Sequence, residues 1–250
     1  MSPARDWDAR SYDRISGPME ALGREVLDRL PLEGDETVLD AGCGTGRVTQ
    51  ALIERLPRGH VIGVDGSAQM IAAARERLGP GPDLRVADLV DLELPEPVDA
   101  VLSTATFHWI GDHPRLFARL HAALRPGGAL AAQCGGMGNV AAVHAAAEAV
   151  GAQAPFAAHF AAWQGPWNFP PPDQAAVRLE QAGFRDVHAW LEPRPVVPDE
   201  PLEFLRTIVL GAHLERLPPE LAEPFTVAVA ERLGDPVTID YVRLNLDAVA

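Results

Sequence analysis

A glycine-rich turn constrains this chain most, because it follows an apolar run at the point where a strand would pass into a helix. The stretch "TVLDAGCGTGRVTQAL" (37–52) places Gly42, Gly44 and Gly46 at alternate positions, with Asp40 two residues before the first glycine. Glycines let a backbone approach a ligand closely, and N–H groups at a helix start bind polar oxygens. We therefore expect a nucleotide- or nucleoside-binding turn at the end of the first strand.

The spacing of this turn argues against two common nucleotide sites. The dinucleotide fingerprint G-x-G-x-x-G needs a third glycine at the position of Arg47, which disfavours a nicotinamide-dependent dehydrogenase. A phosphate-binding loop needs a lysine, and the sequence contains none. The carboxylate of Asp40 would repel a pyrophosphate and attract a cationic amine. The turn is thus better suited to a ligand that has an amine and no phosphate.

Two further acids follow at the ends of the next two expected strands. Asp65 ends "VIGVD", where a carboxylate can accept both hydroxyls of a ribose. Asp88 ends "RVAD", from where it could reach an adenine amino group. Each acid taken alone could be an ordinary cap or a solvated loop carboxylate. Together with the glycine turn they favour a ligand with an amine, a ribose and an adenine, which is S-adenosylmethionine.

Strand-like and helix-like segments alternate along the first half of the chain. We expect strands at 36–42, 60–66, 83–89, 99–105 and 129–135, and helices at 46–56, 67–78 and 113–124. This alternation predicts an α/β fold with a doubly wound, mostly parallel sheet. Further on we expect a helix at 174–184 and strands at 185–193 and 237–249, all within a single domain spanning 1–250. The segments 136–172 and 194–235 are either a helical cap over the ligand edge of the sheet or ordinary packing helices.

Composition narrows the class of partner. A net charge of −14 disfavours nucleic acid as a substrate, and no apolar run approaches the roughly 20 residues of a membrane span. The N-terminal segment resembles no targeting peptide, and Cys43 and Cys134 have no metal-ligand spacing. We expect a cytoplasmic protein that acts on a small molecule without a metal, a membrane or a nucleic acid. The sequence does not indicate an oligomeric state.

Several motifs resemble those of the class I S-adenosylmethionine-dependent methyltransferases. "VLDAGCGTGRVT" looks like their first motif, "VIGVDGSAQMIAAARERL" like the second and "VADLVDL" like the third, while "DAVLSTATFHWIGDHPRLFARLHAALRPGGALAAQ" is similar to the fourth and fifth. The resemblance implies a Rossmann-like sheet of seven strands with the last one antiparallel. It also implies S-adenosylmethionine as methyl donor and S-adenosylhomocysteine as product.

Within this class the chain resembles the trans-aconitate methyltransferase type, which in turn resembles insect juvenile hormone acid methyltransferase. The segments "WDARSYD", "FHWIGDH" and "GPWNFPPPDQAAVRLEQAGF" carry this likeness. The implied cofactor site consists of Tyr12, Asp40, Gly42, Cys43, Gly44, Gly46, Asp65, Gly66, Ser67, Met70, Ala87, Asp88, Leu89, Thr104 and His108. No arginine stands out at a carboxylate-binding position of that type.

Aromatic residues and His108 are the candidates on the acceptor side. In this fold the "STATFHWI" segment would face the transferred methyl group, so His108 is a candidate general base, a donor that orients the acceptor, or a residue that only packs against the cofactor. Trp109 could line the acceptor pocket or belong to the core. Trp7 and Tyr12 could close over the cofactor or belong to a docking helix.

Later residues could complete the acceptor pocket. Trp163, Trp167 and Phe169 would form an apolar wall. Arg206 and His213 could meet an acidic acceptor, although a surface position would also explain His213. We expect methylation of a small molecule, at an oxygen and possibly a carboxylate. A C- or N-methyltransferase of a natural product or quinone and a cofactor-binding regulatory protein without catalysis are the alternatives.

Overall fold

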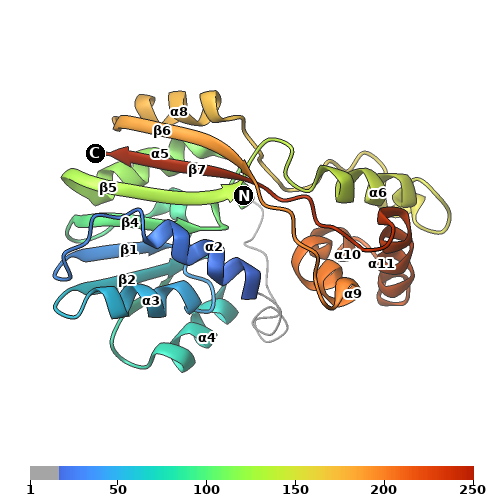
Figure 1. The fold of residues 1–250 in the computed structure, drawn as a ribbon, viewed down its shortest axis with the longest axis horizontal. Coiled ribbons are helices and arrows are strands. Elements are labelled where there is room, and N and C mark those ends of the chain that lie inside the picture. Colours follow the sequence, from blue (N-terminus) through green and yellow to red (C-terminus); the bar gives the residue numbers. More distant parts are fainter. Residues whose placement is uncertain (1–16) are drawn as a thin grey trace.

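A seven-stranded sheet forms the centre of the computed structural model, which describes residues 17–250 (Figure 1). The strand order is β3-β2-β1-β4-β5-β7-β6. The strands are β1 (Thr37–Ala41), β2 (His60–Asp65), β3 (Asp83–Val86), β4 (Val98–Thr104), β5 (Leu124–Gly135), β6 (Arg185–Pro193) and β7 (Val242–Val249). Strands β1 to β5 pair in parallel, and β7 is antiparallel to both of its neighbours. The predicted doubly wound sheet with an antiparallel last strand is confirmed.

Helices cover both faces of this sheet, because alternate side chains of each buried strand point to opposite faces. Val38 packs with apolar residues of α2 (Gly17–Leu27) and α3 (Arg47–Arg55). The neighbouring Leu39 packs with α5 (His113–Ala123) and α8 (Pro172–Gln181) on the other face. Helix α4 (Ala68–Leu78) covers β2 and β3. The carboxyl ends of the parallel strands remain as the place for a ligand.

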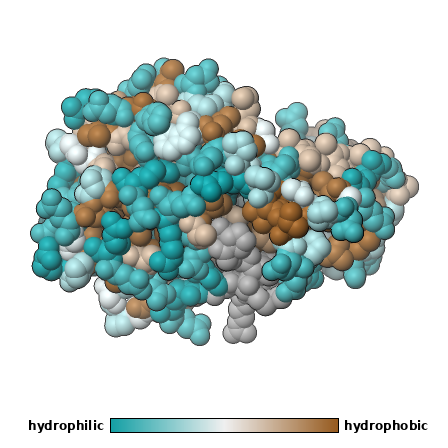
Figure 2. Space-filling view, viewed as in Figure 1, coloured by the Kyte–Doolittle hydropathy of each residue, from teal (hydrophilic) through white to brown (hydrophobic). Residues whose placement is uncertain are grey.

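A helical lobe lies beyond the carboxyl ends of the parallel strands, at the right of Figure 1. It consists of α6 (Ala141–Gly151), α7 (Ala157–Phe160), α9 (Pro201–Phe204), the π-helical turn η3 (Leu205–Val209), α10 (Gly211–Leu214) and α11 (Pro219–Leu233). The lobe has its own apolar core, to which Val143, Leu205 and Phe225 contribute as fully buried residues. On the face shown in Figure 2, hydrophobic residues gather on this lobe near its boundary with the sheet.

Several element boundaries differ from the sequence-based expectation. Strand β5 starts at Leu124, although the strand was expected to start at residue 129, so "RPGG" lies within it. Strand β7 begins at Val242, and Ile239 forms only an isolated bridge with Val196. Strand β3 ends at Val86, which leaves Asp88 as the cap of the short helix η1 (Leu89–Asp91). None of the helices in 17–250 has both the length and the apolar character that a bilayer crossing requires.

Candidate functional site

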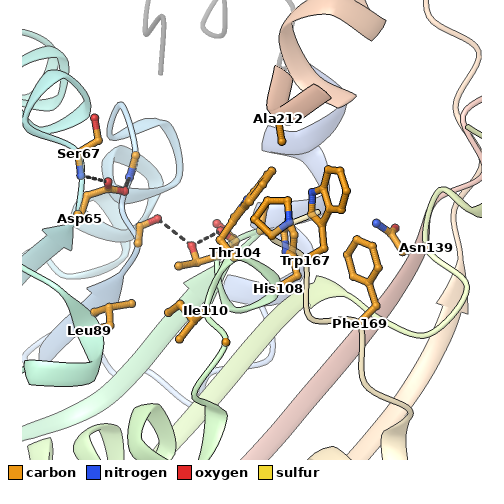
Figure 3. Close-up of a pocket in the computed structure, with 18 of the residues that line it drawn as sticks. Asp65, Ser67, Leu89, Thr104, His108, Ile110, Asn139, Trp167, Phe169 and Ala212 are labelled. Carbon is orange, nitrogen blue, oxygen red and sulfur yellow. Dashed lines mark hydrogen bonds between the residues drawn. The ribbon is translucent and has the colours of Figure 1, made fainter. Parts of the chain in front are cut away.

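A cavity of about 730 Å³ lies between the carboxyl ends of the strands and the helical lobe (Figure 3). Both parts of the structure supply its walls. The predicted residues that line it are Gly42, Gly44, Asp65, Gly66, Ser67, Met70, Ala87, Asp88, Leu89, Thr104, His108, Trp109, Trp167 and Phe169. The turn after β1, the end of β2 and the segment after β4 therefore meet at one site, as parallel strands require.

The glycine turn reaches this cavity in a conformation that favours glycine. Gly42 and Gly44 have φ angles of 88° and 54°. The N–H of Gly42 donates to the carbonyl of Val64 at 2.7 Å, which ties the turn to β2. A Cβ atom on Gly42 would lie 2.0 Å from Oγ1 of Thr106, whereas one on Gly44 would meet no atom within 4 Å. Gly42 is thus required for packing, and Gly44 leaves open space on the ligand side.

Asp65 joins the turn to the next helix through its carboxylate. One oxygen accepts the N–H of Gly44 at 3.0 Å, and the other accepts the N–H of Ser67 at 2.8 Å (Figure 3). Burial raises the pKa of Asp65, while these two hydrogen bonds act in the opposite direction. A carboxylate has about four acceptor positions, so two remain for the hydroxyls of a ligand. The arrangement suits a ribose.

Asp88 and Ser67 start the helices that complete this half of the cavity. The carboxylate of Asp88 accepts the N–H of Val90 at 3.1 Å, and Asp88 is exposed at the cavity wall. The hydroxyl of Ser67 accepts the N–H of Met70 at 3.3 Å and so caps α4. These caps hold the helices whose residues Leu89 and Met70 line the cavity.

Asp40, Cys43 and Gly46 are not in the wall of this cavity. Asp40 is 1% exposed, and the Thr49 hydroxyl donates to its Oδ2 at 2.7 Å. Burial, together with the charge of Asp65, raises the pKa of Asp40 to about 7. Its Oδ1 has no partner among the described residues. Cys43 is buried against β2 and β3, and a Cβ on Gly46 would lie 2.8 Å from Leu78. These three residues are packed against neighbouring elements and do not line the cavity.

His108 lies in the short helix η2 (Phe107–Trp109) after β4, and one ring nitrogen is already engaged. Its Nδ1 atom accepts the N–H of Gly135 at 3.2 Å. Burial, with smaller contributions from the charges of Arg243 and His113, lowers the pKa of His108 to about 3. The ring is therefore neutral at pH 7, and its proton is on Nε2. This geometry favours a hydrogen-bond donor over a general base.

Arg243 is a cavity residue that sequence reasoning missed. It lies on β7 opposite Gly135 of β5, is 3% exposed and stacks 4.7 Å from the centre of the Tyr241 ring. Among the described lining residues it is the only arginine, and its chain has no lysine. The run "YVRLN" carries no local signal for this role. Arg243 lies beside Gly135, the hydrogen-bond partner of His108, only because β7 pairs with β5.

The other residues predicted for the acceptor side lie in different parts of the structure. Trp109 and Trp167 line the cavity, whereas Trp163 lines a second one described below. Arg206 is exposed and pairs with Glu203 at 2.9 Å, so it does not reach the cavity. His213 is buried, which contradicts a surface position. Trp7 and Tyr12 lie outside the described residues. Asn139, Tyr241 and His144 are further lining residues that the sequence did not indicate.

The chain matches known methyltransferases in sequence. Residues 38–128 match the model of a methyltransferase domain. A trans-aconitate 2-methyltransferase of Methylobacterium nodulans is 34% identical over 186 residues, which cover 74% of this chain and 67% of the relative. One from Azoarcus sp. is 40% identical over 127 residues, which are 51% of this chain. In that alignment the chain spans half (50%) of the relative's length.

The fold also matches solved structures. An S-adenosylmethionine-dependent methyltransferase from Mesorhizobium loti superposes with a TM-score of 0.55 at 23% identity. The superposition covers 91% of this chain and 96% of that one. At this identity the likeness supports the architecture, and the residues of the cavity have to carry the chemistry.

Proposed function

The chain belongs to the family of S-adenosylmethionine-dependent methyltransferases, and we propose that it transfers a methyl group from S-adenosylmethionine to a carboxylate oxygen of a small molecule. The bound donor would supply a methyl carbon that is already activated, because its leaving group is a neutral thioether. What this protein has to do is hold the donor, orient the acceptor oxygen and align the two.

The half of the cavity around the glycine turn fits the donor. The free acceptor positions of Asp65 suit the two ribose hydroxyls, and Asp88 lies where an adenine amino group can donate to it. The open space beside Gly44 accommodates the part of the ligand next to the turn. These three features suit a nucleoside bound without a phosphate.

A neutral His108 and the cation Arg243 line the same cavity, and this observation supports a carboxylate as the acceptor. A phenol, an alcohol or a carbon acid would need a base to remove a proton, and His108 holds its proton on the nitrogen that remains available. A carboxylic acid is already ionised at pH 7 and needs no base. Its oxygens can accept hydrogen bonds from Nε2 of His108 and from the guanidinium of Arg243, which suits a carboxylate.

Alignment is then the main contribution of the protein to the rate. Helix η2 is fixed from both sides, because Nδ1 of His108 binds Gly135 and the His108 carbonyl accepts the N–H of Asn168 at 2.9 Å. Asn168 belongs to the proline-rich segment 164–173 that also carries Trp167 and Phe169. One network of hydrogen bonds therefore holds both the orienting donor and the apolar wall beside it.

Two measurements test the proposal. Calorimetric titration with S-adenosylhomocysteine should show tight binding that Asp65→Ala weakens at least 100-fold, whereas NAD should not bind; the opposite pattern would contradict the donor. Turnover with methyl-labelled S-adenosylmethionine against a panel of carboxylic acids and phenols should label acids. If the protein binds the donor and labels nothing in the panel, it is a binding protein without this activity.

A further inference from the structure

A second cavity, of about 620 Å³, lies within the helical lobe between α6, α7 and α10. It shares two wall residues, His144 and Trp167, with the cavity of the proposed donor and acceptor sites. The centres of these two rings are 4.4 Å apart. The two cavities therefore adjoin at the rings of His144 and Trp167, which line both of them.

A continuous series of rings leads from His108 to this second cavity. The ring of Phe169 stacks 5.8 Å from that of His108, and Trp167 stacks 6.5 Å from Phe169 (Figure 3). Beyond Trp167, the ring of His213 lies at 5.2 Å and that of Trp163 at 5.6 Å. An apolar substituent attached to an acceptor at His108 would contact aromatic surface along this whole path.

Two ring nitrogens at the far end lack partners. Nδ1 of His213 and Nε2 of His144 are buried and make no hydrogen bond to any described residue. His213 is only 6% exposed, and burial lowers the pKa of both histidines, so neither is charged at pH 7. A buried polar atom without a partner is costly, and a hydroxyl can both donate to and accept from a neutral imidazole.

The charges of the walls favour an acceptor with one carboxylate. In the first cavity Arg243 is the only arginine among the described lining residues, against the acids Asp65, Asp88, Asp112 and Glu215. The described wall of the second cavity contains Glu148 and no arginine. Among the described lining residues, additional carboxylates on the acceptor would thus face acidic or apolar surface.

We propose that the second cavity is an acceptor subsite that binds an apolar tail with a terminal hydroxyl or keto group, so that the acceptor is a monocarboxylic acid with such a tail. This inference rests on the proposed carboxylate methylation and extends it from the reacting group to the rest of the substrate. The carboxylate would lie at His108 and Arg243, the apolar body along Phe169 and Trp167, and the polar end at His144 and His213.

Adjacent alanines of α7 provide a matched pair of variants. Ala157 lines the second cavity, and the neighbouring Ala158 does not, while both are exposed. Ala157→Phe should fill part of the subsite, and Ala158→Phe should place the same ring in solvent. Neither position belongs to the first cavity. The acceptors are the straight-chain acids from butanoic to dodecanoic acid, ω-hydroxydodecanoic acid and trans-aconitate, with labelled S-adenosylmethionine as donor.

With the unaltered protein, kcat/KM should rise about fourfold for each added methylene until the subsite is filled, and the ω-hydroxy acid should exceed dodecanoic acid. Ala157→Phe should raise KM for the long acids about tenfold without changing KM for butanoic acid, and Ala158→Phe should change neither. A preference for trans-aconitate, or equal kcat/KM at every chain length, would overturn the subsite and leave carboxylate methylation standing. No labelling of any acid would overturn the proposed function, and this inference with it.

Discussion

The Nδ1 atom of His108 accepts a hydrogen bond from the backbone N–H of Gly135 across 3.2 Å. This contact joins the helix after β4 to the end of β5, and it leaves the imidazole proton on Nε2. Because Gly135 lies opposite Arg243 in the sheet, the same contact brings a neutral imidazole and a guanidinium to one wall.

Substitutions of His108 distinguish a role as hydrogen-bond donor from a role as general base. If Nε2–H orients a carboxylate, His108→Asn, which keeps an N–H donor, should retain more kcat/KM than His108→Ala, which should lose about 10- to 100-fold. S-adenosylhomocysteine affinity, measured by calorimetry, should change little in either variant. The kcat of the unaltered protein should be flat from about pH 6 to 9, because no base titrates in that range. Two results together would show that His108 acts as a general base: a kcat of the unaltered protein that falls as the pH is lowered through a pKa near 7, and an equally low kcat in both variants.

Arg243→Gln should weaken acceptor recognition alone. Removing the cation that faces the carboxylate is expected to lower kcat/KM for an acid about 100-fold, mainly through KM, while KM for S-adenosylmethionine stays the same. The matched control is Arg206→Gln, since Arg206 is exposed and pairs with Glu203 away from the cavity. Steady-state kinetics with both substrates varied give the comparison. Equal effects of the two substitutions would refute the role of Arg243.

Gly42→Ala and Gly44→Ala should separate folding from binding. A Cβ on Gly42 meets Thr106 at 2.0 Å at a φ of 88°, so this variant should lose at least about 2–3 kcal/mol of stability. A Cβ on Gly44 meets nothing, so this variant should lose only the 1–2 kcal/mol or so of a left-handed alanine, yet bind S-adenosylhomocysteine more weakly. Urea unfolding and calorimetry measure the two quantities. Unaltered binding in Gly44→Ala would place the ligand elsewhere.

Buried histidines should make the protein unstable in acid. The pKa of His213 is about 3 in the folded state and near 6.5 in an unfolded chain, so the unfolded state binds more protons between these values. Stability is therefore full above about pH 6.5 and falls as the pH is lowered, by about 2 kcal/mol at pH 5 for this one group. His213→Gln should reduce the loss in stability between pH 7 and 5 by roughly that amount in urea unfolding. An identical pH dependence in the variant would show that His213 is not held neutral.

The parts of this structure that could be predicted are those set by neighbouring residues in the chain. The glycine turn follows β1, Asp65 ends β2 and Asp88 lies two residues after the end of β3. Parallel strands bring such ends to one edge, so the half of the cavity around the glycine turn could be predicted from local patterns. His108 follows β4 and lines the cavity for the same reason. Its protonation could not be foreseen, because it depends on the N–H of Gly135 and on burial.

The parts that could not be predicted depend on contacts between distant segments. Arg243 reaches the cavity only because β7 inserts between β5 and β6. Trp163 and Trp167 are close in sequence, yet only Trp167 lines the first cavity, and the packing of the helical lobe decides this. The acid at Asp40 was expected at the ligand, but its hydrogen bond to Thr49 keeps it beneath the turn. The cytoplasmic location and the single domain stay predictions.

The chemical form of the product tests the central claim most directly. After turnover with S-adenosylmethionine labelled in its methyl group and a carboxylic acid, mild alkali should release the label as methanol, because a methyl ester is hydrolysed under these conditions. Label that stays on the product after alkaline treatment would identify an ether, an amine or a carbon centre as the acceptor and would contradict carboxylate methylation.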